Sequence, residues 1–442
     1  MAVTASRRDA VIAFVQTAFV SPALSTSRVA SSSTTTSLAF FNKDDQENVD
    51  IATAPLSQII DLEGTKKQDS NNNLQQYQLV SPAEDVIALE PNQRLICIGD
   101  VHGDFTKLKE FLELGGVYDS ASDKWCGDNT IVVQCGDVLD RGSEELLCFD
   151  LLTRLSQQAA QEKGAVILLW GNHEALNAGG MFHYTTDDVE YEETIGSLID
   201  KQLKTKQWRL QYAGNQPARW AAYEPMGQGL LAHPLLANMK IAVKVGKTVC
   251  VHAGLTSTHL DQFGGITGMN QQAQQWMTDS YYGQKNNNLG DYTSMEQVND
   301  DVNARAQRQA STLPVVLGGG GAAGDLSPVW MRDYSSPNDA PPKSPKAQQM
   351  IDGALFHLQA DRMVMGHTVQ RQINCALNGK AWRVDVGASK GVMNGTPEVL
   401  EVVLQEDGQT EVVSVLTRNG KVPAEDRNVD VSIASAISAI FS

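Results

Sequence analysis

The chain has 442 residues and carries 35 Lys and Arg against 52 Asp and Glu, so its formal net charge is −17. A surface this acidic repels the phosphate backbone of nucleic acids, and nucleic acid is therefore not an expected partner. Hydrophobic residues make up 42% of the chain, which suffices for a large core and excludes a wholly disordered or collagen-like protein. No apolar run reaches the roughly 18 residues that a membrane-spanning helix needs, so stable membrane insertion is not expected.

The first 43 residues differ from the rest, because they contain four basic residues and only one acidic residue. Arg7 and Arg8 precede an apolar stretch at 11–20, which has the length of a signal-peptide core. A Ser- and Thr-rich tract without acidic residues follows, as is typical of transit peptides. This order resembles the bipartite presequences of complex plastids. Residues 1–43 are predicted to be a targeting presequence for the plastid, with another organelle, the secretory pathway or an unstructured tail as alternatives.

The remaining chain divides by composition into three parts. Residues 44–90 are polar and lack an apolar period, which predicts a linker. A folded domain is expected over residues 91–420, followed by a C-terminal tail over residues 421–442. The apolar end of that tail, at 432–441, is too short to span a bilayer and is expected to dock as a strand or helix.

Strands and helices are predicted to alternate from residue 92 onwards. Three apolar runs have the length of buried strands, at residues 92–100, 130–137 and 165–171. Apolar residues at helical spacing predict a helix from Phe105 that stops at Gly115. Ser143 is expected to cap a second helix that ends near Gly164, with Glu145 in its first turn. This alternation indicates a largely parallel sheet, and in such sheets ligands bind beyond the carboxyl ends of the strands.

Polar residues with metal-binding side chains follow each predicted strand. Two later apolar runs, at 247–251 and 362–365, end in the same way. The residues at the five strand ends are Asp100, His102, Asp137, Asn172, His252 and His367. Carboxylate, amide and imidazole groups are ligands that Mn, Fe and Zn ions accept, and a set without thiolates disfavours a structural zinc site. Six such ligands, with one carboxylate between two groups, predict two metal ions bridged by that carboxylate.

Five motifs resemble those of the calcineurin-like metallophosphatases, specifically the phosphoprotein phosphatase superfamily. In the family's order they are GDVHGD (99–104), GDVLDRG (136–142), GNHE (171–174), HAG (252–254) and GHT (366–368). Three longer blocks resemble the Shewanella-like phosphatases of that superfamily, namely GNHEALN (171–177), PVWMRDY (328–334) and RVDVGAS (383–389). The resemblance implies an α/β fold in which two mixed β-sheets are flanked by helices, in the layer order α/β/β/α. The chain departs from the pattern at Ser327, where glycine is more usual, and in a long polar stretch at 283–326.

The resemblance also assigns the ligands. Asp100 and His102 would bind the first metal ion and Asp137 would bridge, while the second ion would be bound by Asn172, His252 and His367. Val369 stands where many related phosphoesterases have a second histidine, so the first ion is expected to keep more water ligands. Two divalent or mixed-valence Mn, Fe or Zn ions are expected, and a hydroxide that they activate would attack phosphorus directly.

The other catalytic roles follow from the chemistry of the reaction. His173 is the expected general acid, because an imidazole whose pKa lies near ambient pH protonates a leaving group efficiently. Asp140 is expected to orient that imidazole. Arg141, Arg332 (by resemblance) and Asn172 are expected to bind the phosphate oxygens of the substrate. Glu174 is expected to support its loop rather than to bind metal.

The expected function is hydrolysis of phosphate monoesters, of a phosphorylated protein or of a small phosphomonoester, with a leaning towards phosphotyrosine from the subgroup resemblance. One alternative is a nucleotide phosphoesterase of the bis(nucleosidyl) tetraphosphate hydrolase type, which shares the metal motifs but needs a basic, base-stacking pocket. The other is a non-catalytic scaffold on a phosphatase fold, although such proteins usually lack a ligand or the acid. The sequence sets neither the native metals nor the oligomeric state.

Overall fold

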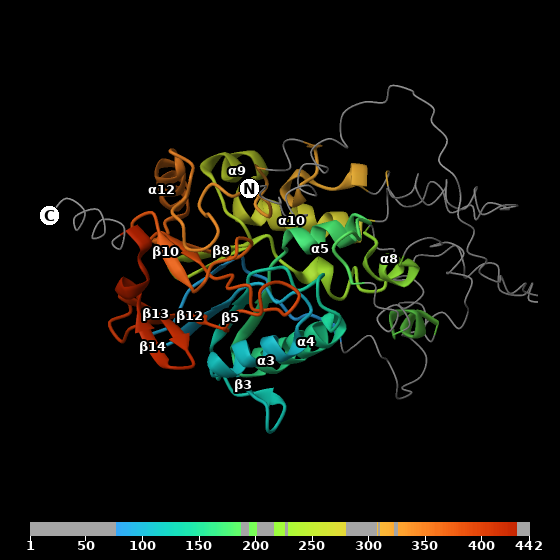
Figure 1. Cartoon of the computed structure of the whole chain (residues 1–442), viewed down its shortest axis with the longest axis horizontal. Helices are drawn as coiled ribbons and strands as arrows, with labels where there is room; N and C mark the ends of the chain where they lie inside the picture. The colour runs from blue at the N-terminus through green and yellow to red at the C-terminus, as the bar shows by residue number, and fades with distance from the viewer. Residues whose placement is uncertain are drawn as a thin grey trace, which may run out of the picture. The chain divides into compact units, whose positions relative to one another are not determined.

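The computed structural model describes residues 77–186, 194–200, 216–225, 229–279, 307, 310–321 and 326–430. The predicted presequence, residues 44–76 of the predicted linker, much of the polar stretch at 283–326 and the apolar segment at 432–441 lie outside these residues. Two six-stranded mixed sheets form the centre of the described part, and helices flank them (Figure 1). This is the α/β arrangement that the motifs imply.

The first sheet contains the three strands predicted between residues 92 and 171. Its order is β14-β13-β12-β2-β5-β6, and the strands are Gly420–Pro423, Glu411–Thr417, Val399–Leu404, Arg94–Ile98, Ile131–Gln134 and Ala165–Leu168. β2, β5 and β6 are parallel, with Ile98 opposite Gln134 and Gln134 opposite Leu168. Because their last residues are in register, the loops that follow these three strands leave the sheet at the same edge.

The second sheet contains the two later strands that precede His252 and His367. Its order is β1-β7-β8-β9-β11-β10, and the strands are Val86–Ile87, Ala242–Val245, Thr248–Val251, Arg362–Met365, Ala381–Arg383 and Asn374–Ala376. β8 and β9 are parallel, with Cys250 opposite Val364, so these two strands also end side by side. The three strands predicted in succession are parallel, but both sheets are mixed, because antiparallel pairs such as β7 with β8 and β12 with β2 complete them.

The two sheets meet through small apolar side chains. Cys97 of β2 and Cys250 of β8 are fully buried, and their Sγ atoms lie 3.7 Å apart. Both are free thiols that pack as small hydrophobic groups. The site loops of β2 and β8 begin two or three residues beyond these cysteines, so contact between the sheets brings the two sets of loops together.

Helices lie on the outer sides of the sheets. Near the first sheet, α3 (Phe105–Leu114) contacts α4 (Glu145–Gln161), which packs on β6. Near the second sheet, α10 (Gly265–Thr278) packs on β7, while α9 (Ser257–Phe263) contacts both α10 and α12 (Ala347–Leu358). Figure 1 shows α3 and α4 on one side of the sheets and α9, α10 and α12 on the other. A small β3–β4 ribbon, Tyr118–Asp119 with Lys124–Trp125, follows α3.

The start of α4 differs from the prediction. The N-cap is Glu144, not Ser143, and its side chain makes no capping hydrogen bond. The carboxylate of Glu145, expected to favour the helix dipole, instead accepts from the backbone N–H of Asp140. This first turn of α4 therefore supports the loop after β5.

The packed part of the chain is longer than residues 91–420. Tyr77 and Leu79 are 3% and 1% exposed, although both belong to the segment assigned to the linker. β1 pairs with β7, and Asp85 Oδ1 accepts from Lys240 Nζ at 2.5 Å. At the other end, β14 extends into the predicted tail and Arg427 forms a buried ion pair with Glu398 at 2.9 Å. These contacts are made by isolated residues in polar segments, which give no apolar period for sequence reasoning to detect.

Within the described residues, no helix combines the length and the apolar character that crossing a lipid bilayer requires.

Candidate metal centre

Backbone hydrogen bonds join the loops that follow β2 and β5. The N–H groups of Val101 and His102 both donate to Asp137 O, at 3.1 and 2.9 Å. Several non-glycine residues of the site loops have left-handed backbone, at His102 (φ 46°), Asp137 (φ 57°), Asp140 (φ 71°), Arg141 (φ 68°) and His367 (φ 66°). Each such residue costs on the order of 1 kcal/mol, and such conformations cluster at functional sites. The surrounding contacts therefore hold these loops in place against their local preference.

The carboxylate of Glu174 supplies most of that restraint. It is fully buried in α5 (Asn172–Ala178) and accepts hydrogen bonds from four backbone N–H groups, those of Gly171, Asp137, Val138 and Leu139, at 2.8 to 3.0 Å. Burial and the nearby Asp137 raise the pKa of Glu174 to about 7, and the backbone donors oppose that rise. Glu174 thus fixes the loop after β5 against the loop after β6, which is the supporting role expected for it.

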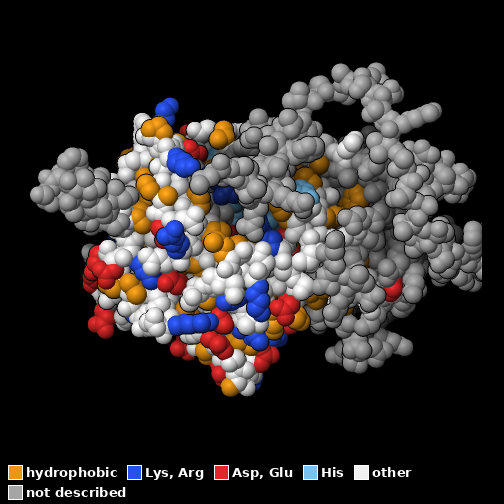
Figure 2. Space-filling view, in the orientation of Figure 1, with side chains coloured by type: hydrophobic (Ala, Val, Ile, Leu, Met, Phe, Trp, Pro, Cys, Tyr) orange, Lys and Arg blue, Asp and Glu red, His pale blue; other side chains and the backbone are white. Residues whose placement is uncertain are grey.

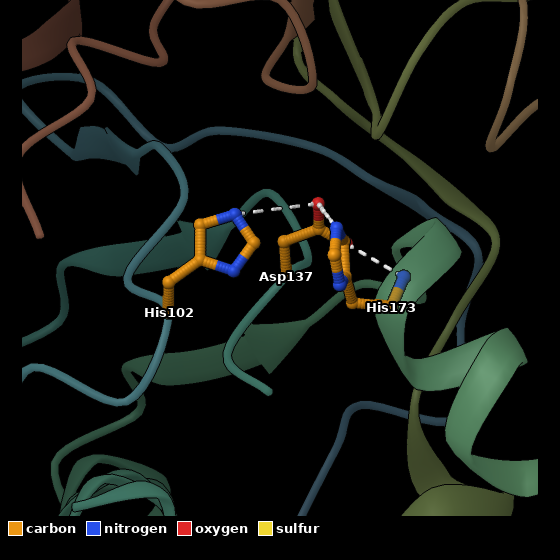
Figure 3. A group of neighbouring side chains, drawn as sticks. All are labelled: His102, Asp137 and His173. Atoms are coloured by element: carbon orange, nitrogen blue, oxygen red, sulfur yellow. Dashed lines mark hydrogen bonds and ion pairs between the residues drawn. The ribbon is translucent and has the colours of Figure 1, made fainter. Parts of the chain in front are cut away.

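Asp137 lies between two groups of imidazole nitrogens. In the first group, shown in Figure 3, Asp137 Oδ2 lies 3.8 Å from His102 Nε2 and 3.9 Å from His173 Nε2. The backbone N–H of His173 donates to Asp137 Oδ1 at 3.0 Å. All three side chains are buried. One oxygen of a single carboxylate therefore faces histidines from the loops of β2 and β6.

The second group joins Asp137 to histidines from the other sheet. Asp137 Oδ2 lies 3.4 Å from His252 Nε2, and His252 Nε2 lies 3.2 Å from His367 Nδ1. Asn172 Oδ1 lies 3.0 Å from His252 Nε2 and 2.8 Å from His367 Nδ1. Four potential ligand atoms, from the loops after β5, β6, β8 and β9, therefore converge, and they belong to the residues expected to bind the second metal ion.

The histidines are oriented as metal ligands should be, and two of them are kept unprotonated by their burial. His102 Nδ1 lies 2.9 Å from Leu139 O, and His252 Nδ1 lies 2.7 Å from Cys135 O, so each ring donates through Nδ1 and directs Nε2 towards Asp137. Burial lowers the pKa of His102 to about 3 and that of His367 well below its usual range. Burial alone would also lower the pKa of the third, His252, but Asp137 raises it above its usual value. Unprotonated imidazole beside carboxylate is the donor set that divalent cations accept, so the residues present fit a metal ion.

Asp100 lies at the edge of both groups, where it is paired with a carboxyl that sequence reasoning missed. Its oxygens accept from the backbone N–H of His367 at 3.2 Å, and the carboxyl group of Asp385 lies close enough to affect its pKa. Burial, Asp385 and Asp137 raise the pKa of Asp100 well above its usual range. Burial likewise raises the pKa of Asp385 to about 6. A cation would compensate this buried cluster of carboxyl groups. Asp385 lies within the RVDVGAS block, and the resemblance of this block to the Shewanella-like phosphatases was the one sequence feature that pointed to it.

His173 and Asp140 form a short, buried pair. His173 Nδ1 lies 2.6 Å from Asp140 Oδ2, and the exposed fractions of the two side chains are 3% and 0%. Burial alone would lower the pKa of His173, but Asp137 and Asp140 raise it above its usual value. Asp140 thus fixes the ring so that Nε2 points to Asp137, at the place where the two groups of ligands meet.

The two arginines reach the centre from different elements. Arg141 Nη2 lies 3.4 Å from His173 Nε2, and its guanidinium lies over the ring of Tyr184, with Cζ 5.5 Å from the ring centroid. Arg332 Nη1 donates to Thr368 Oγ1 at 2.9 Å, beside the ligand His367. The structure therefore brings the predicted acid, the predicted ligands and both predicted arginines to one place. Tyr184 was missed, because no motif marks it.

A family model described as calcineurin-like phosphoesterase matches residues 93–319, which is just over half of the chain. The chain belongs to the calcineurin-like phosphoesterase family. Shewanella-like protein phosphatase 2 of Arabidopsis thaliana is 33% identical over 341 residues, which cover 71% of this chain and 76% of the relative. The chain is accordingly a phosphatase of the phosphoprotein phosphatase type, in the Shewanella-like group.

Two further similarities cover different shares of the chain. Shewanella-like protein phosphatase 1 of Plasmodium berghei (strain Anka) is 31% identical over 165 residues, 37% of this chain and 40% of the relative. The crystal structure of the cold-active protein-tyrosine phosphatase of a psychrophile Shewanella species superposes with a TM-score of 0.48 at 20% identity, covering 78% of this chain and 84% of that chain.

The role of Glu174 gives the first testable prediction. Glu174→Ala leaves four buried N–H groups without their acceptor, and each such group costs about 1–3 kcal/mol. The free energy of unfolding is expected to fall by on the order of 3 kcal/mol or more, with loss of bound metal, as measured by denaturant unfolding and elemental analysis. The control is Glu113→Ala, which removes an exposed carboxylate of α3 and should change stability by no more than about 0.5 kcal/mol. Similar stabilities for the two variants would contradict the role given to Glu174.

Proposed function

We propose that the chain is a dinuclear metal-dependent protein phosphatase that hydrolyses phosphate monoesters. The observation that carries the proposal is the position of Asp137, whose Oδ2 lies within 3.4 to 3.9 Å of imidazole nitrogens from His102, His173 and His252. A carboxylate between two ligand groups is the arrangement that bridges two cations. The His173–Asp140 pair lies directly beside it.

The ligands divide between two ions. Asp100, His102 and Asp137 would hold the first ion, and Asp137, Asn172, His252 and His367 the second. Two bound Mn, Fe or Zn ions would lower the pKa of water to near neutrality and reduce the negative charge on the phosphoryl group. The chain's own contribution is to hold imidazoles and carboxylates together in a buried site, where Asp100, Asp137 and the expected histidine ligands are at most 8% exposed.

His173 would donate a proton to the leaving oxygen from Nε2. The hydrogen bond from Nδ1 to Asp140 stabilises the protonated ring and fixes its orientation. In the alternative role of metal ligand, Nε2 would have to be unprotonated. The raised pKa of His173 favours the acid, since the ring then carries a proton to donate near neutral pH.

Arg141 and Arg332 would bind the phosphoryl oxygens. A guanidinium offers two parallel N–H donors that match two phosphoryl oxygens. The face drawn in Figure 2 has Lys and Arg side chains in the middle of the view, although the net charge of the chain is −17. Local positive charge of this kind favours approach of a phosphate dianion.

Tyr184 favours an aryl leaving group. Its ring centroid lies 5.0 Å from that of His173, and Arg141 lies over the same ring. An aromatic surface beside the acid offers the ring of phosphotyrosine a stacking partner, worth about 0.5–1.5 kcal/mol for an aromatic pair. Phosphoserine has no such group to place there. We therefore propose a preference for phosphotyrosine over phosphoserine.

An assay of the full chain with added Mn²⁺ tests this function. The substrates are phosphotyrosine peptides, phosphoserine peptides and a dinucleoside tetraphosphate. The highest kcat/KM is expected for phosphotyrosine peptides, with about two metal ions per chain by elemental analysis. Tyr184→Leu should reduce the preference by about tenfold at most, which corresponds to the stacking energy. Fastest turnover of the dinucleotide would favour the nucleotide phosphoesterase instead. One ion per active chain would contradict the dinuclear site, and inactivity with two ions bound would favour a scaffold.

A second experiment separates the acid from the metal ligands. His173→Asn is expected to keep both metals and to lose about 10²–10⁴-fold in kcat/KM on phosphopeptides, whose leaving oxygen needs a proton. Nitrophenyl phosphate should lose much less, because nitrophenolate leaves as a stable anion. Arg141→Ala is the comparison, since loss of a phosphoryl contact should affect both substrates alike. Equal losses for the two substrates in His173→Asn would show that His173 is not the acid.

We also propose that residues 1–43, which lie outside the described residues, direct the chain to the plastid. The support is their basic, Ser- and Thr-rich composition behind a signal-like apolar core. A fluorescent protein fused to these residues should enter plastids, and the mature chain should begin beyond Ala18. Uniform cytosolic fluorescence with an uncleaved N-terminus would contradict the proposal.

A further inference from the structure

The carboxylate of Asp140 has two oxygens with different partners. Oδ2 lies 2.6 Å from His173 Nδ1, and Oδ1 accepts from Asn177 Nδ2 at 2.8 Å. Asn177 lies one helical turn beyond His173 in α5, and its Nδ2 also donates to His173 O at 2.9 Å. The backbone N–H of Asp140 is bound by Glu145. Asn177 therefore fixes the carboxylate of Asp140 through Oδ1, the oxygen that does not contact the imidazole, and Glu145 fixes its main chain.

Arg219 connects the groups that hold Asp140. It lies in α8 (Pro217–Tyr223), which packs against α5 (Figure 1), and it is 1% exposed. Its Nη1 donates to Asn177 Oδ1 at 2.7 Å, and its Nη2 donates to Glu145 Oε2 at 2.5 Å. Nη1 also lies 3.8 Å from Asp140 Oδ1. One guanidinium thus contacts both residues that bind Asp140 and balances charge between two fully buried carboxylates.

The contact with Arg219 reinforces the direction in which the amide of Asn177 points. An arginine only donates hydrogen bonds, so the atom of Asn177 that faces it must be the carbonyl oxygen. The amide nitrogen is then directed at Asp140, where a donor is required. Asp140 Oδ1 and His173 O favour the same orientation, because both accept from Nδ2, and Arg219 holds the amide from its oxygen end. The orientation of Asp140, and through it that of His173, depends on a residue in a different helix.

We propose that Arg219 and Asn177 are positioning residues of the general acid. They hold Asp140 so that it keeps the imidazole of His173 directed at the leaving oxygen. This inference rests on the proposed role of His173. Arg219 and Asn177 act through Asp140, and neither has a place among the groups that would touch phosphate or metal. The segment that contains α8 therefore contributes to turnover by completing the support of the acid.

The test measures the dependence of the loss on the leaving group, in the full chain at matched metal content. Asn177→Ala is expected to lose about tenfold in kcat on phosphopeptides, a fraction of the 10²–10⁴-fold that an acid contributes, and less than about threefold on nitrophenyl phosphate. KM should change little, because no phosphate contact is removed. Arg219→Met should show the same pattern, and Arg219→Lys, which keeps the charge and a donor, should recover part of the loss.

A buried asparagine outside the centre provides the control. Asn270 of α10 accepts from the backbone N–H of Ile241 at 2.7 Å and donates to Asp85 at 2.8 Å. Asn270→Ala should lower stability without any dependence of activity on the leaving group. If Arg219→Met does not fold, since it leaves two buried carboxylates without their cation, Asn177→Ala decides.

A double variant separates positioning from stability. Adding Asn177→Ala to His173→Asn should cause no further loss of kcat, because residues that act as a unit are not additive. An additional tenfold loss in the double variant, or equal losses of Asn177→Ala on both substrates, would overturn the inference while the acid assignment stands. If His173→Asn alone loses kcat/KM equally on both substrates, the assignment of His173 as the acid fails. This outcome differs from failure of the present inference, because it is seen in a variant in which Asn177 and Arg219 are unchanged.

Discussion

The centre depends on one buried carboxylate that is not expected to touch either metal or substrate. Glu174 binds backbone N–H groups of both the β5 loop and the β6 loop, and so sets the distance between Asp137 and the residues at the start of α5. Left-handed backbone at Asp137 and Asp140 is locally unfavourable, and such residues persist where the surrounding structure restrains them. Glu174 provides that restraint through hydrogen bonds that a smaller or neutral side chain would not reproduce. Glu145 of α4 also binds this loop, because its carboxylate accepts from the backbone N–H of Asp140.

The predicted metal ligands come from both sheets, and this division explains why the two candidate groups share a single residue. His102 and Asp137 follow strands of the first sheet, whereas His252 and His367 follow strands of the second. The contact between Cys97 and Cys250 shows how closely the sheets approach below the centre. A carboxylate at the junction is the group that reaches nitrogens on either side, and Asp137 occupies that position. The site is thus a property of the packing of the two sheets, and neither sheet forms it alone.

Much of this arrangement follows from the sequence, and the exceptions have physical reasons. The strands before Asp100, Asp137 and Asn172 are short apolar runs bounded by glycine, so both the elements and the edge at which their loops meet were predicted correctly. Tyr77 and Leu79 were assigned to a linker, because two buried residues in a polar segment give no periodic pattern. Asp385 and Arg219 are single charged residues whose partners lie far away in the chain. Only a three-dimensional structure brings Arg219 within reach of residues 42 and 74 positions distant.

The strand order of the first sheet has a consequence for the time at which the centre is completed. The loop after β2 contains the first predicted metal ligands. In the sheet, β2 lies between β5 and β12, and β12 comes later in the chain than His367, the last predicted ligand. During synthesis, one edge of β2 therefore has no strand to pair with until residues 399–404 have been made. Pairing between segments so distant in sequence is slow, and an unpaired strand edge favours association with other chains. We therefore expect metal binding to follow the pairing of β12 with β2, late in the maturation of this protein.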